Sequence, residues 1–344
     1  MIVYVETGLV VLLIDLETLD VDKFLHSLVC CPDCNSELYE QKDTIRCKGC
    51  QAVFALEDGI PLLFSQEILQ DPLFHAYKQQ YDKHSKEVHD YNSKYTKYLA
   101  ASLLERLRHH VSDYRAASRM QNSTRKLVNY MSAGTRFVGP TTGLTVLDIG
   151  SSEGPLLAAL QGNRVAFDIS PLHLKHVVSE DILPVSGFAE KLPFKNAVFD
   201  RVICAAVFEH VLKPELIADE ITRVLKPSGK AVILVPFNEN PEKLFELQED
   251  KSKDPIVETR PHSDKKKRRP ETLHLRNFES VEDLTRFFPK LHLTRTEYFF
   301  YKRKRHFPKP LKTLLRPFRW TPDSFKRGFP SLFAPSLLHV ELTR

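Results

Sequence analysis

No stretch of this sequence reaches the roughly 20 consecutive apolar residues that a membrane-spanning helix needs. The most apolar segment near the start, residues 8–16, is shorter and is interrupted and followed by acidic residues. It also lacks the basic leader and the small-residue cleavage site of a signal peptide. These absences favour a globular protein of the cytoplasm, peripheral to a membrane at most. Residues 1–23 are expected to form an N-terminal extension, whose apolar run at 8–16 is a strand or a frayed segment.

A disulfide framework is excluded as well, because six cysteines are few for a chain of 344 residues. Four of them form two C-x-x-C pairs, joined by a hairpin with a strand-like segment at 43–46. This spacing predicts a zinc ribbon over residues 24–66, with a redox pair or free buried thiols as the alternatives. A closed four-cysteine site leaves no position for a substrate, so its role is structural or in recognition. The predicted zinc ligands are Cys31, Cys34, Cys47 and Cys50, and Cys30 is given no role.

The net charge is small, +5, but it is unevenly distributed along the chain. Residues 258–335 hold 20 lysines and arginines against 8 acidic residues, a local net charge of +12 in a chain whose total is +5. The basic residues gather at 265–269 and, interleaved with aromatics, at 301–335. Such segments bind RNA through phosphate contacts and stacking, or an anionic membrane surface. Solvated insertions are the alternative.

Residues 145–168 have the pattern of a βαβ unit: an apolar β-branched strand, a glycine loop, a short helix and a second strand. Gly150 and Gly154 bracket the loop, and a proline follows where a helix begins, since its fixed φ suits that position. An aspartate lies near the carboxyl end of each strand, Asp148 in the first and Asp168 in the second. Ligands of open α/β sheets bind at this end.

The loop itself argues against a dinucleotide. Its pattern is Asp148-x-Gly150-x-Ser152-x-Gly154, whereas a dinucleotide fold would show G-x-G-x-x-G. A carboxylate inside the loop would repel a pyrophosphate and suits a cationic or amino-acid-bearing ligand. A nucleotide-binding or purely structural βαβ unit is the alternative for this stretch alone.

Three more segments follow in order: 185–194 with A-E-K-L-P-F, 197–211 ending in F-E-H-V, and 223–229 reading R-V-L-K-P-S-G. Together with 145–168 they resemble the class I S-adenosylmethionine-dependent methyltransferases, in the broad type 11 branch. The resemblance implies an α/β fold with a Rossmann-like, seven-stranded sheet that carries helices on both faces.

The resemblance also implies which residues hold S-adenosylmethionine. The glycine loop approaches the methionine part, Asp168 takes the ribose hydroxyls, and Phe188 with Ala189 flanks the adenine. Two departures stand out: Ser152 replaces the middle glycine, and Phe188 replaces an acid that often accepts a hydrogen bond from the adenine. The implied cofactor-binding set is Asp148, Gly150, Ser152, Gly154, Asp168, Ile169, Phe188, Ala189 and Ala205.

The rest of the chain divides around this core. Residues 24–66 resemble the small Trm112-like zinc ribbon, including its D-G-I-P exit. Residues 67–140 are expected to form a helical cap or substrate region, with helical spacing over 70–84 and 97–114. The methyltransferase domain then covers 141–344, with basic insertions at 237–278 and 301–335.

Several tyrosines of the cap region either line a substrate site or belong to ordinary packing. Further helices are expected from Pro171 to about residue 179, over 217–225, and over 280–288 with Ser280 as N-cap and Asp283 in the first turn. The fourth strand is expected at 202–205, the sixth at 291–300 and the seventh at 336–342. The tyrosines are Tyr77, Tyr81, Tyr91, Tyr95 and Tyr98.

Two histidines are candidates for the catalytic base, His210 after the fourth strand and His274 from the first insertion. Glu209 and His210 match the end of an E-x-x-E-H pattern that one branch uses for a metal, but Ala206 stands at its first position, so no catalytic metal is predicted. Both residues are equally well interpreted as the start of a helix.

These features favour O-methylation of a glycan, a glycolipid or another small acceptor. RNA base methylation is the first alternative, because a ribbon ahead of a methyltransferase core resembles the layout of ribosomal RNA guanine-N1 methyltransferases. That family's metal set includes a histidine, which this ribbon lacks, and no N-P-P-Y segment is present for exocyclic amines. A non-catalytic, cofactor-binding partner protein is the second alternative.

Overall fold

The structure is a computed structural model that describes residues 27–100, 133–177, 181–237, 246–248, 256–258, 274–299, 302–303, 326–328 and 333–344. The expected N-terminal extension, the helical pattern beyond residue 100, the basic run 265–269 and most of both insertions lie outside these residues. Within the described part, no helix is long and apolar enough to cross a membrane.

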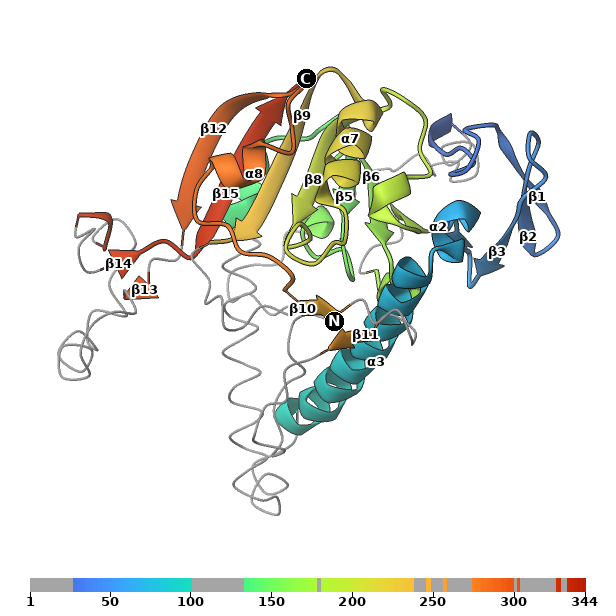
Figure 1. The fold of residues 1–344 in the computed structure, drawn as a ribbon, viewed down its shortest axis with the longest axis horizontal. Helices are drawn as coiled ribbons and strands as arrows, with labels where there is room; N and C mark the ends of the chain where they lie inside the picture. The colour runs from blue at the N-terminus through green and yellow to red at the C-terminus, as the bar shows by residue number, and fades with distance from the viewer. Residues whose placement is uncertain are drawn as a thin grey trace.

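One mixed sheet forms the centre of the molecule (Figure 1). Seven of its strands run in the order β7-β6-β5-β8-β9-β15-β12, in which β15 is antiparallel to both of its neighbours and the pairs from β7 to β9 are parallel. This arrangement confirms the predicted Rossmann-like sheet with its antiparallel edge. The strands are β5 (Thr145–Ile149), β6 (Asn163–Asp168), β7 (Ile182–Ser186), β8 (Phe199–Ala205), β9 (Leu225–Pro236), β12 (His292–Phe299) and β15 (Leu337–Thr343).

The direction of the strand order reverses next to β5, since β6 lies on one side of it and β8 on the other. The carboxyl ends of β5 and β8 therefore flank the topological switch point, where open α/β sheets bind ligands. These central strands are apolar on both faces, as parallel strands covered on both sides require. Leu147 packs into one core cluster and Val146 into the other, following the alternation of a strand.

The cysteine-bearing segment continues the same sheet. Its meander consists of β1 (Leu38–Gln41), β2 (Thr44–Cys47), β3 (Val53–Glu57) and β4 (Ile60–Leu62), and β4 pairs in parallel with β7. The amide of Leu63 donates to the carbonyl of Ser186 at 2.8 Å. A second attachment joins Cys30 N to the carbonyl of Pro193 at 3.0 Å. The ribbon therefore adds four strands to the sheet, giving eleven.

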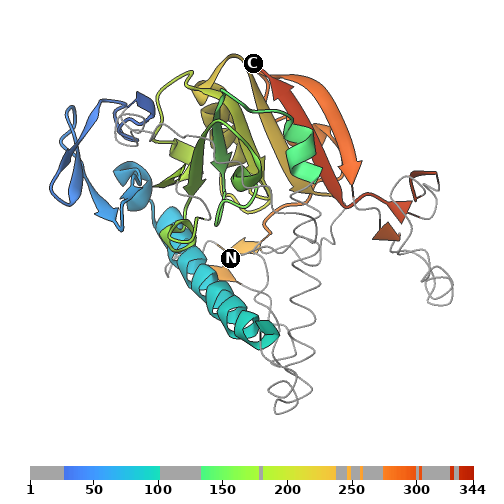
Figure 2. The same cartoon turned by 180° about the vertical axis from the view of Figure 1, so that it is seen from behind.

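Helices lie on both faces of the sheet. α7 (Pro214–Val224) and α8 (Glu282–Thr285) cover the face seen in Figure 1, and a helix at 133–138 covers the other face (Figure 2). After α2 (Gln66–Gln70), the long α3 (Pro72–Ala100) extends away beneath the carboxyl ends of the strands. The remaining short elements are α6 (Pro171–Leu174), the 3-10 helices η1 (Leu157–Ala159) and η2 (Ala189–Lys191), and the strand pairs β10 (Glu246–Gln248) with β11 (Ile256–Glu258) and β13 (Lys302–Arg303) with β14 (Phe333–Ala334).

Three expected helices are shorter than their sequence patterns suggest. The helix after Gly154 is only a 3-10 turn, because the chain reverses at Gly162, with φ +91°, to start β6. α6 tightens into i to i−3 hydrogen bonds through Val177. α8 does the same before a proline. It begins only at Glu282, which places Val281 and not the expected Ser280 at the N-cap, although the backbone N–H groups of Ser280 and Asp283 each donate to the other's side chain.

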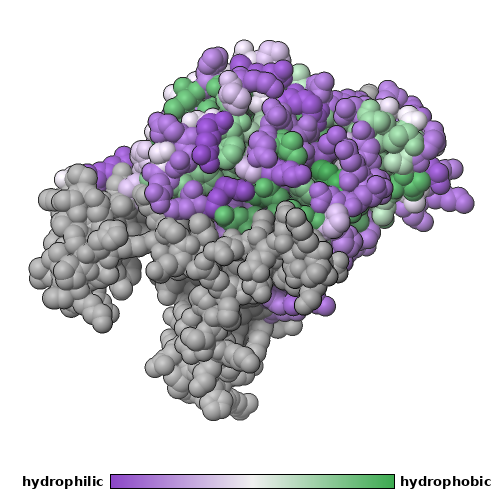
Figure 3. Space-filling model, in the orientation of Figure 1, coloured by the Kyte–Doolittle hydropathy of each residue, from purple (hydrophilic) through white to green (hydrophobic). Residues whose placement is uncertain are grey.

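The described surface is mainly hydrophilic on the face shown in Figure 3, and its apolar areas are small and separated. The large apolar side chains that are exposed lie on different elements: Val53 on β3, Leu216 on α7 and Leu293 on β12. Single exposed apolar residues of this kind are normal for a globular protein.

Candidate active site

A tight loop follows β5 at the switch point. Gly150 and Gly154 have φ angles of +72° and +71°, and the amides of Gly150 and Ser151 both donate to the carbonyl of Phe167 at the end of β6. A Cβ on Gly150 would lie 2.2 Å from Cγ2 of Val207, so both the backbone angle and the space require glycine there. Ser152 also has a positive φ, +53°, and therefore keeps the left-handed conformation of the glycine that it replaces.

Two buried aspartates stand at the ends of β5 and β6. The carboxylate of Asp168 accepts hydrogen bonds from the amides of Ser152, at 2.9 Å, and Ser170, at 2.8 Å, so it ties the loops after both strands together. Asp148 is equally buried, and its Oδ1 has no hydrogen-bond partner among the described residues. Buried polar atoms without partners are uncommon, and here they mark a place where a ligand would complete the hydrogen bonding.

The electrostatics of this pair favour a cation. Burial and, to a lesser extent, the charge of Asp168 raise the pKa of Asp148 to about 8. Burial also raises the pKa of Asp168, and the nearby His173 opposes that shift, its Nδ1 lying 3.9 Å from Oδ1 of Asp168. A cation bound beside these two buried carboxyl groups would therefore stabilise their ionised forms.

Helix α3 covers this end of the sheet through its first tyrosines. The Tyr77 hydroxyl donates to the carbonyl of His210 at 3.1 Å, and the ring of Tyr81 lies 6.0 Å from that of Tyr77. Burial, followed by the charges of Asp168 and Glu209, raises the pKa of Tyr81. Both tyrosines thus lie beside the site. The side chains of the three remaining tyrosines named above lie outside the described part.

The two candidate bases meet although an insertion separates them in the sequence. The ring centroids of His210 and His274 are 4.8 Å apart at an angle of 79°, and His210 Nε2 lies 3.8 Å from Oε1 of Glu209. The amide of Leu275 donates to the carbonyl of Glu209 at 2.6 Å, and Arg276 donates to the carbonyl of Phe208, so the returning chain is fixed on the loop after β8.

Glu209 and His210 do not begin a helix, which corrects that interpretation of the sequence. They lie in a turn, and α7 starts only at Pro214. In the sequence, each histidine is a candidate by itself and Glu209 has no predicted functional role. A glutamate directly before a candidate base was the available signal, but its burial, with 1% of the residue exposed, comes only from the fold.

The residues expected around adenine differ in burial, since Phe188 is buried and others are only half-buried. The ring of Phe188 is 1% exposed and makes edge-to-face contacts with Phe64 and Phe74, at 5.2 and 5.8 Å between centroids. It therefore joins the ribbon exit and α3 to the core. Ala189 opens η2, and the half-buried Ile169 and Ala205 follow and end their strands. The adenine contact of Phe188 and Ala189 stays a prediction.

Known proteins match the part of the chain that carries this loop. Residues 147–233 match the family model of a methyltransferase domain. The match begins inside β5 and ends inside β9, so it includes Asp148, the glycine loop, Asp168 and the turn at Glu209.

Curated relatives match a part of the chain of similar length. A demethylmenaquinone methyltransferase of Clavibacter sepedonicus is 35% identical over 109 residues, which are 29% of this chain and 44% of that protein. A ubiquinone biosynthesis O-methyltransferase of Xylella fastidiosa is 33% identical over 104 residues, 27% of this chain and 42% of that protein. A ubiquinone/menaquinone biosynthesis C-methyltransferase of Bordetella parapertussis is 35% identical over 106 residues, 27% and 40%. The chain covers less than half the length of these relatives.

Solved structures align more widely at low identity. An S-adenosylmethionine dependent methyltransferase from Mesorhizobium loti has 14% identity and a TM-score of 0.40, covering 62% of this chain and 96% of that chain. A chain from the Haloferax volcanii complex that contains the Trm112 methyltransferase activator has 17% identity and a TM-score of 0.43, covering 67% and 96%.

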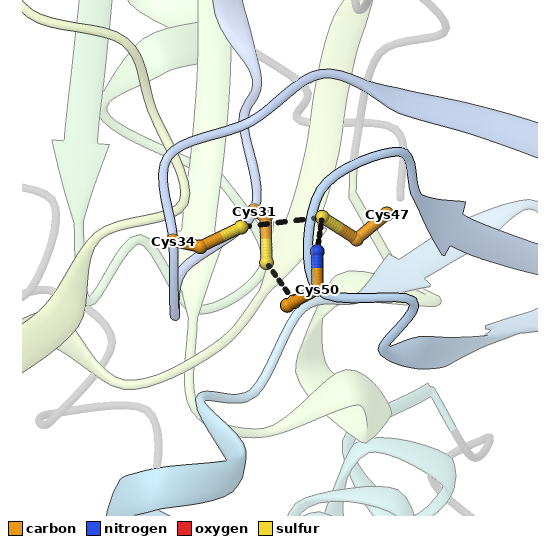
Figure 4. Close-up of side chains that lie close together, drawn as sticks. All are labelled: Cys31, Cys34, Cys47 and Cys50. Carbon is orange, nitrogen blue, oxygen red and sulfur yellow. Dashed lines mark hydrogen bonds between the residues drawn. The ribbon is translucent and has the colours of Figure 1, made fainter.

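The four predicted zinc ligands come together at the edge of the methyltransferase domain (Figure 4). The Sγ atoms of Cys31 and Cys50 are 3.6 Å apart, and those of Cys34 and Cys47 are 3.3 Å apart. Four sulfurs around one tetrahedral zinc would be separated by about 3.8 Å, given Zn–S bonds of about 2.3 Å. The thiol set therefore fits a zinc ion without rearrangement of the chain.

Local hydrogen bonds also prepare these sulfurs for a cation. The amides of Gly49 and Cys50 donate to Sγ of Cys47 at 3.3 and 3.4 Å. Hydrogen bonds from Ser36 lower the pKa of the Cys34 thiol to about 6, whereas burial raises the pKa of Cys31. Cys30 points elsewhere, with its Sγ 3.8 Å from Oδ1 of Asn35.

Proposed function

We propose that this protein is an S-adenosylmethionine-dependent methyltransferase that methylates a hydroxyl oxygen of a small acceptor, such as a glycan or a glycolipid. The main support is the loop after β5, whose left-handed glycines are tied by Asp168 to the end of β6 at the switch point of the sheet. The match of residues 147–233 to a methyltransferase domain supports the same proposal.

The residues at the switch point suit S-adenosylmethionine. Asp148 and Asp168 would face its positive charges and its ribose hydroxyls, and Gly150 lets the backbone come close. Oδ1 of Asp148 and the buried Oγ of Ser151 have no hydrogen-bond partner among the described residues, which fits a polar ligand at this place. When bound, this cofactor supplies a methyl group on a sulfonium, and the displacement mainly requires that donor and acceptor are held in line.

The acceptor side is supported by the histidine pair. An alcohol acceptor loses a proton during methylation, and an imidazole is suited to take it near neutral pH. His210 lies on the loop after β8, and His274, on the chain that returns from the first insertion, contacts it next to Tyr77 and Tyr81. One curated relative is named as an O-methyltransferase and another as a C-methyltransferase, both of quinone biosynthesis. An acceptor hydroxyl on a small ring is therefore within the proposed class.

We also propose that the ribbon is a Trm112-like module that holds structural Zn²⁺ through its four cysteines. Its chemistry fits this role, because the set is closed and offers no ligand position to a substrate. The pairing of β4 with β7 supports a role in stabilising the core next to the cofactor loops.

Binding isotherms test the cofactor assignment. Wild-type protein should bind S-adenosylmethionine, and Asp168→Ala should bind it at least about 100-fold more weakly. The variant would lose the two hydrogen bonds that the ribose hydroxyls donate to the charged carboxylate, each worth about 1.5–3 kcal/mol. Asp219→Ala is the matched control, because its side chain is 60% exposed and pairs with Lys290 on the surface. Equal affinity in the Asp168 variant would contradict the assignment.

The acceptor is identified by incubation with methyl-labelled S-adenosylmethionine and fractionated lysate. Label in the glycan, lipid or small-molecule fraction is the expected result. Label in RNA would favour the RNA alternative and would direct attention to the basic insertions. Cofactor binding with no label in any fraction would favour a non-catalytic partner protein.

A further inference from the structure

The loop after β8 and the chain returning from the first insertion bring three metal-binding side chains together. One ligand atom from each of Glu209, His210 and His274 lies within 4.8 Å of the others. The donors are a carboxylate oxygen and two imidazole nitrogens, provided by two segments that are far apart in the sequence. They belong neither to the cysteine set nor to the cofactor-binding set described above.

Hydrogen bonds to the backbone hold the two segments of this cluster beside each other. The carbonyl of Glu209 accepts from Leu275 N at 2.6 Å, which fixes the residue next to His274. The carbonyl of His210 accepts from the Tyr77 hydroxyl at 3.1 Å. A site whose ligands are oriented before binding loses less entropy when the ion arrives, so this fixation favours a specific site.

The donor set is also chemically suited to a cation. Two imidazoles and one carboxylate form the three-ligand set of several zinc and iron enzymes, and such a set leaves coordination positions open. His210 Nε2 and Glu209 Oε1 are 3.8 Å apart, whereas two ligand atoms on one zinc ion lie about 3–3.5 Å apart. A small rotation of the side chains would close this difference. The site therefore needs only small movements to bind an ion.

The charges around this cluster allow a divalent cation. Glu209 is buried, and the charges of both Asp168 and Glu209 act on Tyr81, so two carboxylates belong to the same region. Arg276 adds one positive charge near Glu209, but its guanidinium is directed to the carbonyl of Phe208. The balance of formal charge in the immediate surroundings remains negative.

We infer that Glu209, His210 and His274 form a binding site for a divalent first-row transition-metal cation, with Zn²⁺ as the reference ion. The sequence analysis predicted no catalytic metal because Ala206 leaves the local pattern incomplete, and His274 supplies the third ligand from the other side of the insertion. The open positions would hold the hydroxyl oxygen of the acceptor next to the methyl donor, and the ion would then lower the pKa of that hydroxyl in place of an imidazole base. That role rests on the proposed function, whereas ion binding does not.

Metal content tests the inference directly. Full-length protein is dialysed against a Zn²⁺ buffer and its zinc is measured by mass spectrometry. Wild type should hold two zinc ions per chain, one in the ribbon and one in this cluster. His274→Ala and Glu209→Gln should hold one. His292→Ala is the matched control, since that histidine is exposed on β12, and it should keep two.

A Co²⁺ titration provides the second readout. The ribbon should show thiolate-to-metal charge-transfer bands, and the cluster should add only weak visible bands that disappear in His274→Ala. One zinc per chain in wild type, or two in the His274 variant, would overturn the inference. A binding isotherm with S-adenosylmethionine on the same samples distinguishes the metal site from the proposed function. Cofactor binding without a second zinc would contradict only the metal site. A second zinc without cofactor binding would contradict only the proposed function.

Discussion

The raised pKa of Asp148 predicts that cofactor binding releases a proton. The buried carboxyl has a pKa of about 8 instead of 3.8, so roughly nine-tenths of it is protonated near pH 7. S-adenosylmethionine brings a sulfonium and an ammonium to this region, and those charges favour the ionised carboxylate. Binding at about pH 7 should therefore release most of one proton from Asp148.

The same shift sets the pH dependence of affinity. Below the pKa, ionisation of Asp148 must accompany binding, so the affinity should rise about tenfold per pH unit between about pH 6 and 7.5 and level off above about pH 8. Asp148→Asn keeps the shape of the side chain and removes its titration. The variant should show neither the slope nor the proton release that are due to this residue.

Calorimetry in two buffers of different ionisation enthalpy measures the proton release at constant pH. Any proton exchange on the ligand or elsewhere in the protein is shared by the Asp148→Asn variant, so the difference between the two proteins belongs to Asp148. A difference close to zero would show that Asp148 does not release the proton.

Protein stability gives an independent check on the same carboxyl. Because its pKa is higher in the folded than in the unfolded protein, the folded state binds the proton more tightly between about pH 4 and pH 8. The free energy of unfolding should therefore fall as the pH rises through that window, and this part of the fall should be absent in Asp148→Asn. Urea unfolding at a series of pH values measures it.

Three further substitutions test the scaffold of the site. Gly150→Ala should lower the free energy of unfolding by about 2–4 kcal/mol through the contact with Val207 and the positive φ, and an added Val207→Ala should restore only the contact part in urea unfolding. Cys47→Ser should lower zinc content and melting temperature together, since this buried thiol belongs to the ribbon; an unchanged melting temperature would contradict a structural zinc. Arg223→Lys should cost about 1–3 kcal/mol, because the guanidinium donates to two backbone carbonyls as well as to Glu220, which a lysine cannot reproduce; chemical denaturation decides.

Sequence patterns predicted much of the core because its proposed ligand-binding residues are close together in the sequence. The spacing of Asp148, Gly150, Gly154 and Asp168 fixes a strand, a turn and a second strand, and the structure has all three. The departure at Ser152 was visible in the sequence, and its consequence is a serine with a glycine-like φ of +53°.

Contacts between distant segments could not be predicted in the same way. No pattern near Leu62 indicates that its strand pairs with β7, because that pairing depends on the register of two separate units. The meeting of His210 with His274 depends on where a long insertion returns. The aromatic ring of Phe188 is of the kind that can stack on adenine. Its burial against Phe64 and Phe74, however, depends on how α3 and the ribbon exit are attached to the core.

The pairing of β4 with β7 also determines how the sheet ends. β4 meets β7 at its last residue, through Leu62 and Ser186. Without the ribbon, the backbone groups at this end of β7 would be open to pairing with another chain. The ribbon moves the edge outward to β1, a strand of four residues that is exposed over its second half. Short polar edges discourage aggregation. The cysteine-bearing segment thus covers the carboxyl end of β7, the part of that edge nearest the loops of the site.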